Sequence, residues 1–159
     1  MNARKTFILA SALSLAVTVL QAAQPDEDSS AGTWKLNITK SSFAQNPPPK
    51  SETRTYTVTP EGTHMVLEEE FADGTKLRIE TLITYDGKPH MSVGSRDFDS
   101  VAGKRIDRNV TTADLLRNGK VIGTLRREIS PDGKTMKMTY LINKADGTTV
   151  SALSLFERQ

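Results

Sequence analysis

Residues 120–143 read KVIGTLRREISPDGKTMKMTYLIN, and this stretch decides the fold class. Largely apolar positions alternate with largely polar ones over residues 120–129, and the same alternation returns over residues 134–143. A period of two places successive side chains on opposite faces of a β-strand. Asp132-Gly133 lies between the two patterns, and Asp-Gly favours a tight hairpin because both residues tolerate positive φ. The stretch therefore predicts two antiparallel strands joined by a turn.

The same pattern of turn and strand repeats along the chain. Further turn dipeptides are Glu61-Gly62, Asp73-Gly74, Asp86-Gly87, Asn118-Gly119 and Asp146-Gly147. The segments between them are rich in β-branched residues and alternate with a period of two. They predict strands at about 32–39, 52–59, 63–71, 75–85, 90–94, 100–107, 110–117, 120–129, 134–143 and 148–158. Since no stretch of this region sustains a 3.6-residue period, the predicted fold class is all-β.

About ten consecutive strands with short turns predict a single up-and-down antiparallel meander. Closure of such a sheet into a barrel removes both exposed edges, so we expect a barrel; a two-sheet sandwich is the alternative. Residues 41–50, SSFAQNPPPK, interrupt the pattern. Their three prolines oppose strand pairing and predict a stiff, extended connector after the first strand.

The N-terminus has the order of a secretory signal. Two basic residues precede an uncharged stretch from Thr6 to Leu20, and small residues follow it. The apolar stretch is shorter than the roughly 20 residues of a membrane-spanning helix. We therefore predict a signal peptide over residues 1–23, cleaved near Ala22 or Ala23, with an uncleaved N-terminal anchor as the alternative. The protein is expected to be exported, to the periplasm or the extracellular medium, with no stable membrane span after cleavage.

The remaining chain is divided into a polar, flexible leader over residues 24–31 and one domain over residues 32–159. Removing the two basic residues of the signal from the 21 Lys and Arg leaves 19, which equals the 19 Asp and Glu. With no net charge and no basic block, nucleic-acid binding is not expected. The sequence contains no cysteine, which excludes disulfides, thiolate metal sites and a lipid-modified cysteine.

Several short motifs resemble the calycin group. GTWKL at residues 32–36 resembles the signature of lipocalins and fatty-acid-binding proteins, in which the tryptophan lies across the closed end of the barrel. LRREI at residues 125–129 and FER at residues 156–158 are similar to late strands of the fatty-acid-binding proteins. The resemblance implies a lipocalin-like or fatty-acid-binding-protein-like barrel of about ten strands.

The chain also resembles, over its whole mature length, small exported bacterial proteins of lipocalin-like type whose function is uncharacterised. The motifs are GTWKLN, PPPK, YDGK, KRID, NGKV and SPDGKT. Two features depart from fatty-acid-binding proteins. The connector at residues 41–50 stands where they have two helices, and Ser154 stands where their last strand has a carboxylate-binding arginine. A paired-arginine site for fatty acids is therefore not implied.

Four residues are candidates for ligand binding. Arg127 belongs to an otherwise apolar row, which also contains Val121, Gly123, Leu125 and Ile129. A buried guanidinium needs either an internal partner or a ligand anion. The matching residue of fatty-acid-binding proteins points into the cavity. Arg54 raises the same question on the second predicted strand, and Tyr140 adds an amphipathic wall. Ser154 is included because it stands at the position of the carboxylate-binding arginine in the last strand of fatty-acid-binding proteins.

No catalytic, metal-binding or cofactor-binding residue is predicted. The two histidines, His64 and His90, lack a metal-ligand spacing. A Gly-x-Ser-x-Gly elbow and a cysteine nucleophile are both absent from the sequence, so a non-enzyme is favoured.

Three functional hypotheses follow from these observations. In the first, the barrel binds a small, mostly apolar molecule in its interior, and Arg127 fixes the polar end of that molecule. In the second, an enzyme uses the same cavity, with Arg127 and Tyr140 as its acid/base pair. In the third, a filled barrel is an envelope protein that contacts a protein partner. The sequence sets no oligomeric state.

Overall fold

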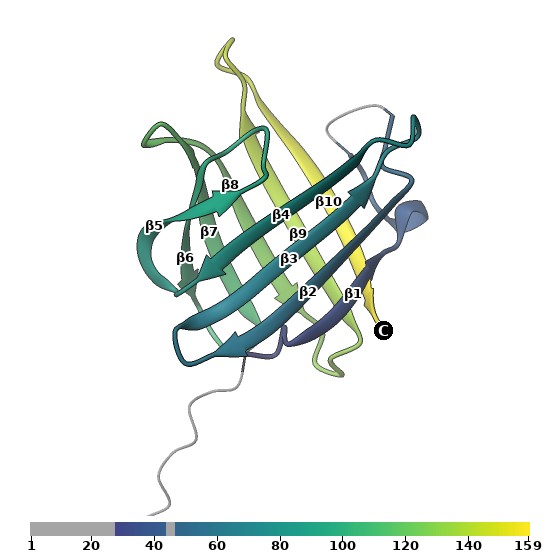
Figure 1. Ribbon diagram of the computed structural model, residues 1–159, viewed down its shortest axis with the longest axis vertical. Coiled ribbons are helices and arrows are strands. Elements are labelled where there is room, and N and C mark those ends of the chain that lie inside the picture. The colour runs from purple at the N-terminus through teal and green to yellow at the C-terminus, as the bar shows by residue number, and fades with distance from the viewer. Residues whose placement is uncertain (1–27, 44–46) are drawn as a thin grey trace, which may run out of the picture.

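The computed structural model describes residues 28–43 and 47–159, and it contains ten antiparallel strands that form one closed barrel (Figure 1). The strands are β1 (Gly32–Leu36), β2 (Ser51–Thr59), β3 (Gly62–Glu70), β4 (Lys76–Ile83), β5 (Asp86–Val93), β6 (Ser100–Arg105), β7 (Val110–Arg117), β8 (Lys120–Ile129), β9 (Thr135–Asn143) and β10 (Thr149–Arg158). Each strand pairs with its neighbours in the chain, as the turn spacing predicted.

Closure is made by β1, which pairs with β2 on one side and with β10 on the other. Trp34 is at the centre of this junction, opposite Arg54 in β2 and opposite Arg158 in β10. The prediction of a closed meander is therefore confirmed, and the sandwich alternative is excluded.

The predicted strand limits agree closely with those observed except at two strands. Asp86-Gly87 was predicted as a turn before a strand at about 90–94, but both residues begin β5, and the connection lies at residues 84–85, where Tyr85 has a positive φ. The first strand was expected to extend to residue 39, but β1 ends at Leu36 and a short 3₁₀ helix, η1 (Ile38–Lys40), follows. The side chain of Asn37 caps η1 by accepting a hydrogen bond from the backbone N–H of Lys40. Among the residues that the structure describes, no helix is long and apolar enough to cross a membrane.

The barrel has two distinct ends (Figure 1). The base holds residue 28, the β2–β3 turn and the C-terminus, whereas the mouth holds the connector after β1 and the β9–β10 turn. Trp34 is fully buried near the base, where its Nε1 donates a hydrogen bond of 2.7 Å to the Ser30 carbonyl. The guanidinium of Arg158 stacks 4.2 Å from the indole ring centre. The tryptophan thus lies at the closed end, as the calycin resemblance implied.

Residues 28–31 correct the expectation of a flexible leader. Asp28 is 3% exposed and Ser30 is fully buried, because both pack into the base of the barrel. Arg158 holds the same segment by donating from Nη2 to the Ser29 carbonyl at 2.7 Å. Residues 24–27 and the predicted signal peptide lie outside the described residues.

The pairing of β4 with β5 is the shortest of the strand pairings in the barrel. Its register consists of two pairs, Glu80 with Val93 and Thr81 with Ser92. The hydroxyls of Thr81 and Ser92 form a buried hydrogen bond of 2.6 Å. Gly94 follows the last residue of β5 and also packs closely against β4, because its backbone approaches that of Arg78.

We predict that Gly94→Ala destabilises the fold more than Gly74→Ala. Both glycines have positive φ, +91° and +83°, so alanine meets similar backbone strain at each. A Cβ at residue 94 would lie 2.0 Å from the Arg78 carbonyl oxygen, whereas residue 74 has open space. Chemical denaturation should show a loss of about 2–3 kcal/mol for Gly94→Ala and about 1 kcal/mol for Gly74→Ala. Equal losses would contradict the importance of this close approach.

Candidate functional site

A buried carboxylate organises the base of the barrel. Asp28 Oδ1 lies 3.2 Å from Arg127 Nη2, and Oδ2 lies 3.3 Å from Arg105 Nη2. Three hydroxyls also donate to this carboxylate at 2.6 to 2.7 Å, namely those of Ser30, Thr63 and Tyr85. Each oxygen of the Asp28 carboxylate therefore contacts one arginine and accepts at least one hydrogen bond from a hydroxyl.

These partners determine the ionisation of Asp28. Burial by itself would raise the pKa of its carboxyl group. The Arg127 charge and the hydrogen bonds from Tyr85, Thr63 and Ser30 act in the opposite direction and outweigh burial, so the pKa of Asp28 lies well below its ordinary value. The carboxylate is consequently charged at neutral pH.

Arg127 has the internal partner that the sequence left as one of two alternatives. Its side chain is 5% exposed, and Nη2 donates to both Asp28 and the Tyr85 hydroxyl, the latter at 2.9 Å. The ring of Tyr56 lies 5.0 Å from its guanidinium carbon. Within the described part of the chain, Arg127 Nε has no hydrogen-bond partner. Arg127 is therefore paired with a carboxylate of the protein itself, which it shares with Arg105.

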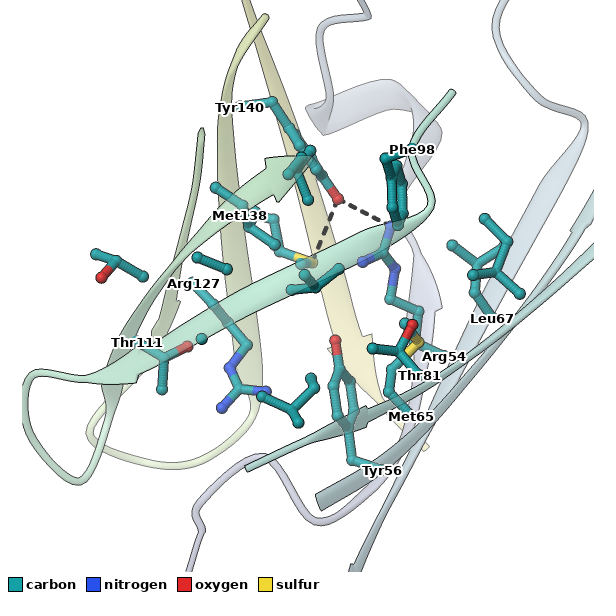
Figure 2. A pocket seen from close by; sticks show the side chains of 18 of the residues that line it. Arg54, Tyr56, Met65, Leu67, Thr81, Phe98, Thr111, Arg127, Met138 and Tyr140 are labelled. Atoms are coloured by element: carbon teal, nitrogen blue, oxygen red, sulfur yellow. Dashed lines mark hydrogen bonds between the residues drawn. The ribbon is translucent and has the colours of Figure 1, made fainter. Parts of the chain in front are cut away.

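A second polar group crosses the barrel toward the mouth. Arg54 Nε donates to Glu52 Oε1 at 2.6 Å, and its Nη2 donates to the Tyr140 hydroxyl at 2.9 Å. The Tyr140 hydroxyl in turn lies 3.7 Å from the Met138 sulfur. Figure 2 shows Arg54 and Tyr140 pointing toward one another, with the guanidinium of Arg127 lying away from this contact. The chain of hydrogen bonds links β2 with β9 across the interior.

Burial acts on both members of this contact. It would lower the pKa of Arg54, but Glu52 and the nearby tyrosines more than compensate, so that the pKa lies well above its ordinary value. Burial raises the pKa of Tyr140, and the Arg54 charge offsets this only in part. At neutral pH, Arg54 is thus a cation paired with Glu52, and Tyr140 is a neutral phenol.

Two cavities lie on either side of this contact. The inner cavity has a volume of about 100 Å³ and reaches Arg127, while the mouth cavity has a volume of about 400 Å³. Five residues line both and form the partition between them: Arg54, Leu67, Phe98, Leu115 and Tyr140. Ligand pockets usually measure about 300–1,000 Å³, so room for a small molecule lies at the mouth rather than deep inside.

Three of the four predicted site residues meet at the mouth cavity. Arg54, Tyr140 and Ser154 all line it, whereas Arg127 lies beyond the partition, against the base. Glu52 and Glu69 also line the mouth cavity but were not selected from the sequence. The period-two pattern could have indicated both, because Glu52 is two residues from the inward-facing Arg54 in β2 and Glu69 is two residues from the inward-facing Leu67 in β3.

One predicted face needs correction. The alternation placed Val121 on the inward face of β8 with Arg127, but Val121 is 48% exposed. The register shifts here, since Leu115 pairs with Gly123 while Leu116 pairs with Val121. This bulge at Ile122 exchanges the two faces and brings Ile122 into the mouth cavity.

The two histidines lie in separate places. His64 Nε2 is 3.9 Å from a Glu80 oxygen, and His90 Nε2 is 3.1 Å from an Asp86 oxygen. Over residues 28–43 and 47–159, no three His, Asp or Glu side chains are grouped in a way that would hold a metal ion.

Comparison with known proteins bears on the fold. No protein-family profile matches this sequence, and no curated protein matches it either. The crystal structure of zebrafish ileal bile acid-binding protein complexed with cholic acid is similar to this chain, with a TM-score of 0.52 and 11% sequence identity. The similarity covers 82% of this chain and 99% of that chain. The chain therefore has a fatty-acid-binding-protein-like barrel fold. The resemblance to small exported bacterial proteins stays a prediction.

We predict that Asp28→Asn destabilises the protein strongly at neutral pH. The substitution leaves the buried guanidinium of Arg127 without its counter-charge, which costs about 3–5 kcal/mol. Because the pKa of Asp28 is lowered in the folded state, its contribution is complete above the unfolded pKa of about 3.9 and is lost as the pH falls toward the folded value. Urea denaturation should therefore show the difference from the parent protein shrinking below about pH 4.

Glu70→Gln is the matched control, because it removes a carboxylate whose ion pair with Lys50, at 2.6 Å, is largely exposed. We expect little change in stability from it, because an exposed ion pair is screened by water and contributes little. A loss for Asp28→Asn no larger than that of the control would show that the base cluster does not hold the barrel together.

Proposed function

We propose that this protein binds a small, mostly apolar molecule in the mouth cavity of its barrel. The observation that carries the proposal is the cavity itself, which measures about 400 Å³ and is lined mainly by apolar side chains. A few polar groups converge on it, and this combination is typical of small-molecule sites. The apolar lining comprises Phe43, Pro49, Leu67, Phe98, Leu115, Ile122, Ile142, Val150 and Ala152.

The polar groups are placed where they can orient a bound molecule. Tyr140 and Ser154 line the cavity beside Arg54. Ser154 is 6% exposed, and its hydroxyl makes no hydrogen bond with the side chains and backbone that the structure describes. A hydroxyl that lines a cavity can donate a hydrogen bond to a ligand there and accept one from it. The zebrafish protein of the same fold forms a complex with cholic acid, which supports the use of this architecture for small molecules.

Filling the mouth cavity should weaken binding of a small apolar molecule. We expect N-phenyl-1-naphthylamine, a neutral apolar fluorophore, to bind saturably to the parent protein. Ala152→Trp places an indole in the cavity beside Tyr140, its partner across β9 and β10, and should weaken binding by about tenfold or more. Ser151→Trp, on the exposed face of the same strand, should leave the affinity unchanged. Absence of saturable binding, or equal losses in both variants, would overturn the proposal.

We also propose that the protein acts outside the cytoplasm, on the basis of its signal-like N-terminus. Cleavage near Ala22 or Ala23 would retain Asp28, which the barrel base requires. Expression of the full sequence in a Gram-negative host should yield a periplasmic protein. Its intact mass, measured by mass spectrometry, should equal that of a chain that begins at Ala23 or Gln24. Recovery of the full-length mass from the cytoplasmic fraction would contradict export.

A further inference from the structure

Two carboxyl groups lie side by side on one wall of the mouth cavity. Glu52 in β2 and Glu69 in β3 are directly opposite in the strand register, and both side chains line the mouth cavity. Like charges at opposed positions destabilise a sheet. The pair is therefore costly to the empty barrel, and a cation between the two groups would remove that cost.

The carboxylate of Glu52 is incompletely satisfied. Its side chain is 7% exposed, and Oε1 accepts the hydrogen bond from Arg54. Oε2 accepts no hydrogen bond from any group that the structure describes. A carboxylate has capacity for several donors, so a nine-tenths buried one that lines a cavity is poised to accept another. The connector residues 44–46, whose placement is not described, have no ionisable side chain.

The charges around the mouth cavity disfavour an anionic ligand. Its lining carries three carboxyl groups, from Glu52, Glu69 and Asp97, and two cations, from Arg54 and Lys144. The charge of Arg54 is already matched by Glu52 at 2.6 Å, and Lys144 is exposed at the rim. A ligand carboxylate would consequently meet like charge without a free buried cation.

An organic cation fits this lining better than a metal ion. Among the described side chains, no group of three or more carboxylates and histidines is arranged as a metal site. The wall beside Glu52 and Glu69 is instead apolar and aromatic, with Phe43 and Phe98 among its members. Aromatic rings attract ammonium groups through their faces and also bury an apolar chain.

We infer that the polar end of the bound molecule is a protonated amine, held between Glu52 and Glu69 at the mouth. This inference rests on the proposed function, because it assigns a chemical class to the ligand of that same cavity. It also separates this barrel from carboxylate binding, which the resemblance to fatty-acid-binding proteins would otherwise suggest.

The ionisation of Glu69 makes the inferred preference depend on pH. The pKa of Glu69 is raised to about 7, mainly by burial; the charges of Glu52 and Asp97 add to this shift and the charge of Arg54 opposes it. Tyr140 stays a neutral phenol over this range because burial raises its pKa, and Asp97 and Lys144 are the other ionisable residues that line the cavity beside Glu52 and Arg54. Raising the pH through 7 therefore adds one negative charge beside the amine and should tighten its binding.

The test compares three probes with the same ten-carbon chain: decylamine, decanol and decanoate. Each is titrated against the fluorophore-loaded parent protein at about pH 8, where Glu69 is ionised. We expect decylamine to bind about tenfold more tightly than decanoate, a difference of about 1.4 kcal/mol, with decanol between them. At about pH 5.5 the preference should fall several-fold, because the Glu69 carboxyl group is then protonated.

Glu69→Gln should remove most of the preference at pH 8 together with its pH dependence. Glu68→Gln is the control, since Glu68 is exposed on the outer face and pairs with Arg78 at 2.8 Å. Decanoate binding as tightly as decylamine, or an unchanged preference in Glu69→Gln, would overturn the amine inference alone. Failure of all three probes and of the fluorophore would instead overturn the proposed function.

Discussion

Pairing of β1 with β10 is the constraint on which the rest of the structure depends. It turns an open meander into a closed barrel, and it places Trp34 where Arg54 and Arg158 flank it in the register. Without closure, the inward faces of all ten strands would be open to water. The ion pairs of the interior would then be screened and the carboxylates would have ordinary pKa values.

Closure separates the interior into two polar regions with different roles. At the base, Asp28 is surrounded by donors, and its charge is matched by Arg127 and Arg105. At the mouth, Glu52 and Glu69 are opposed and only partly matched by Arg54. The base cluster stabilises the fold, although Arg105 Nη1 and Arg127 Nε have no hydrogen-bond partner among the described residues. At the mouth, the carboxyl groups have interaction capacity left for a ligand.

The position of the available space follows from this arrangement. Arg54 and Tyr140 bond across the barrel and, with three apolar side chains, form a floor beneath the mouth cavity. Beneath that floor, about 100 Å³ remains. The barrel therefore presents a shallow site with an acidic and aromatic lining, even though its fold is shared with a protein that forms a complex with cholic acid.

Period-two alternation and Asp-Gly or Asn-Gly turns were sufficient to predict the strands and their order, because these are local properties of the backbone. The bulge at Ile122 was not predictable, since it depends on how β7 and β8 pair. The role of Asp28 as the counter-charge of Arg127 and Arg105 was also not predictable, because a polar residue before the first strand is typical of a flexible leader. Only the tertiary structure brings Asp28 to Arg127, because contacts between residues so distant in sequence are not set by the local pattern of the chain, whereas Glu52 meets Glu69 through the register of the β2–β3 hairpin.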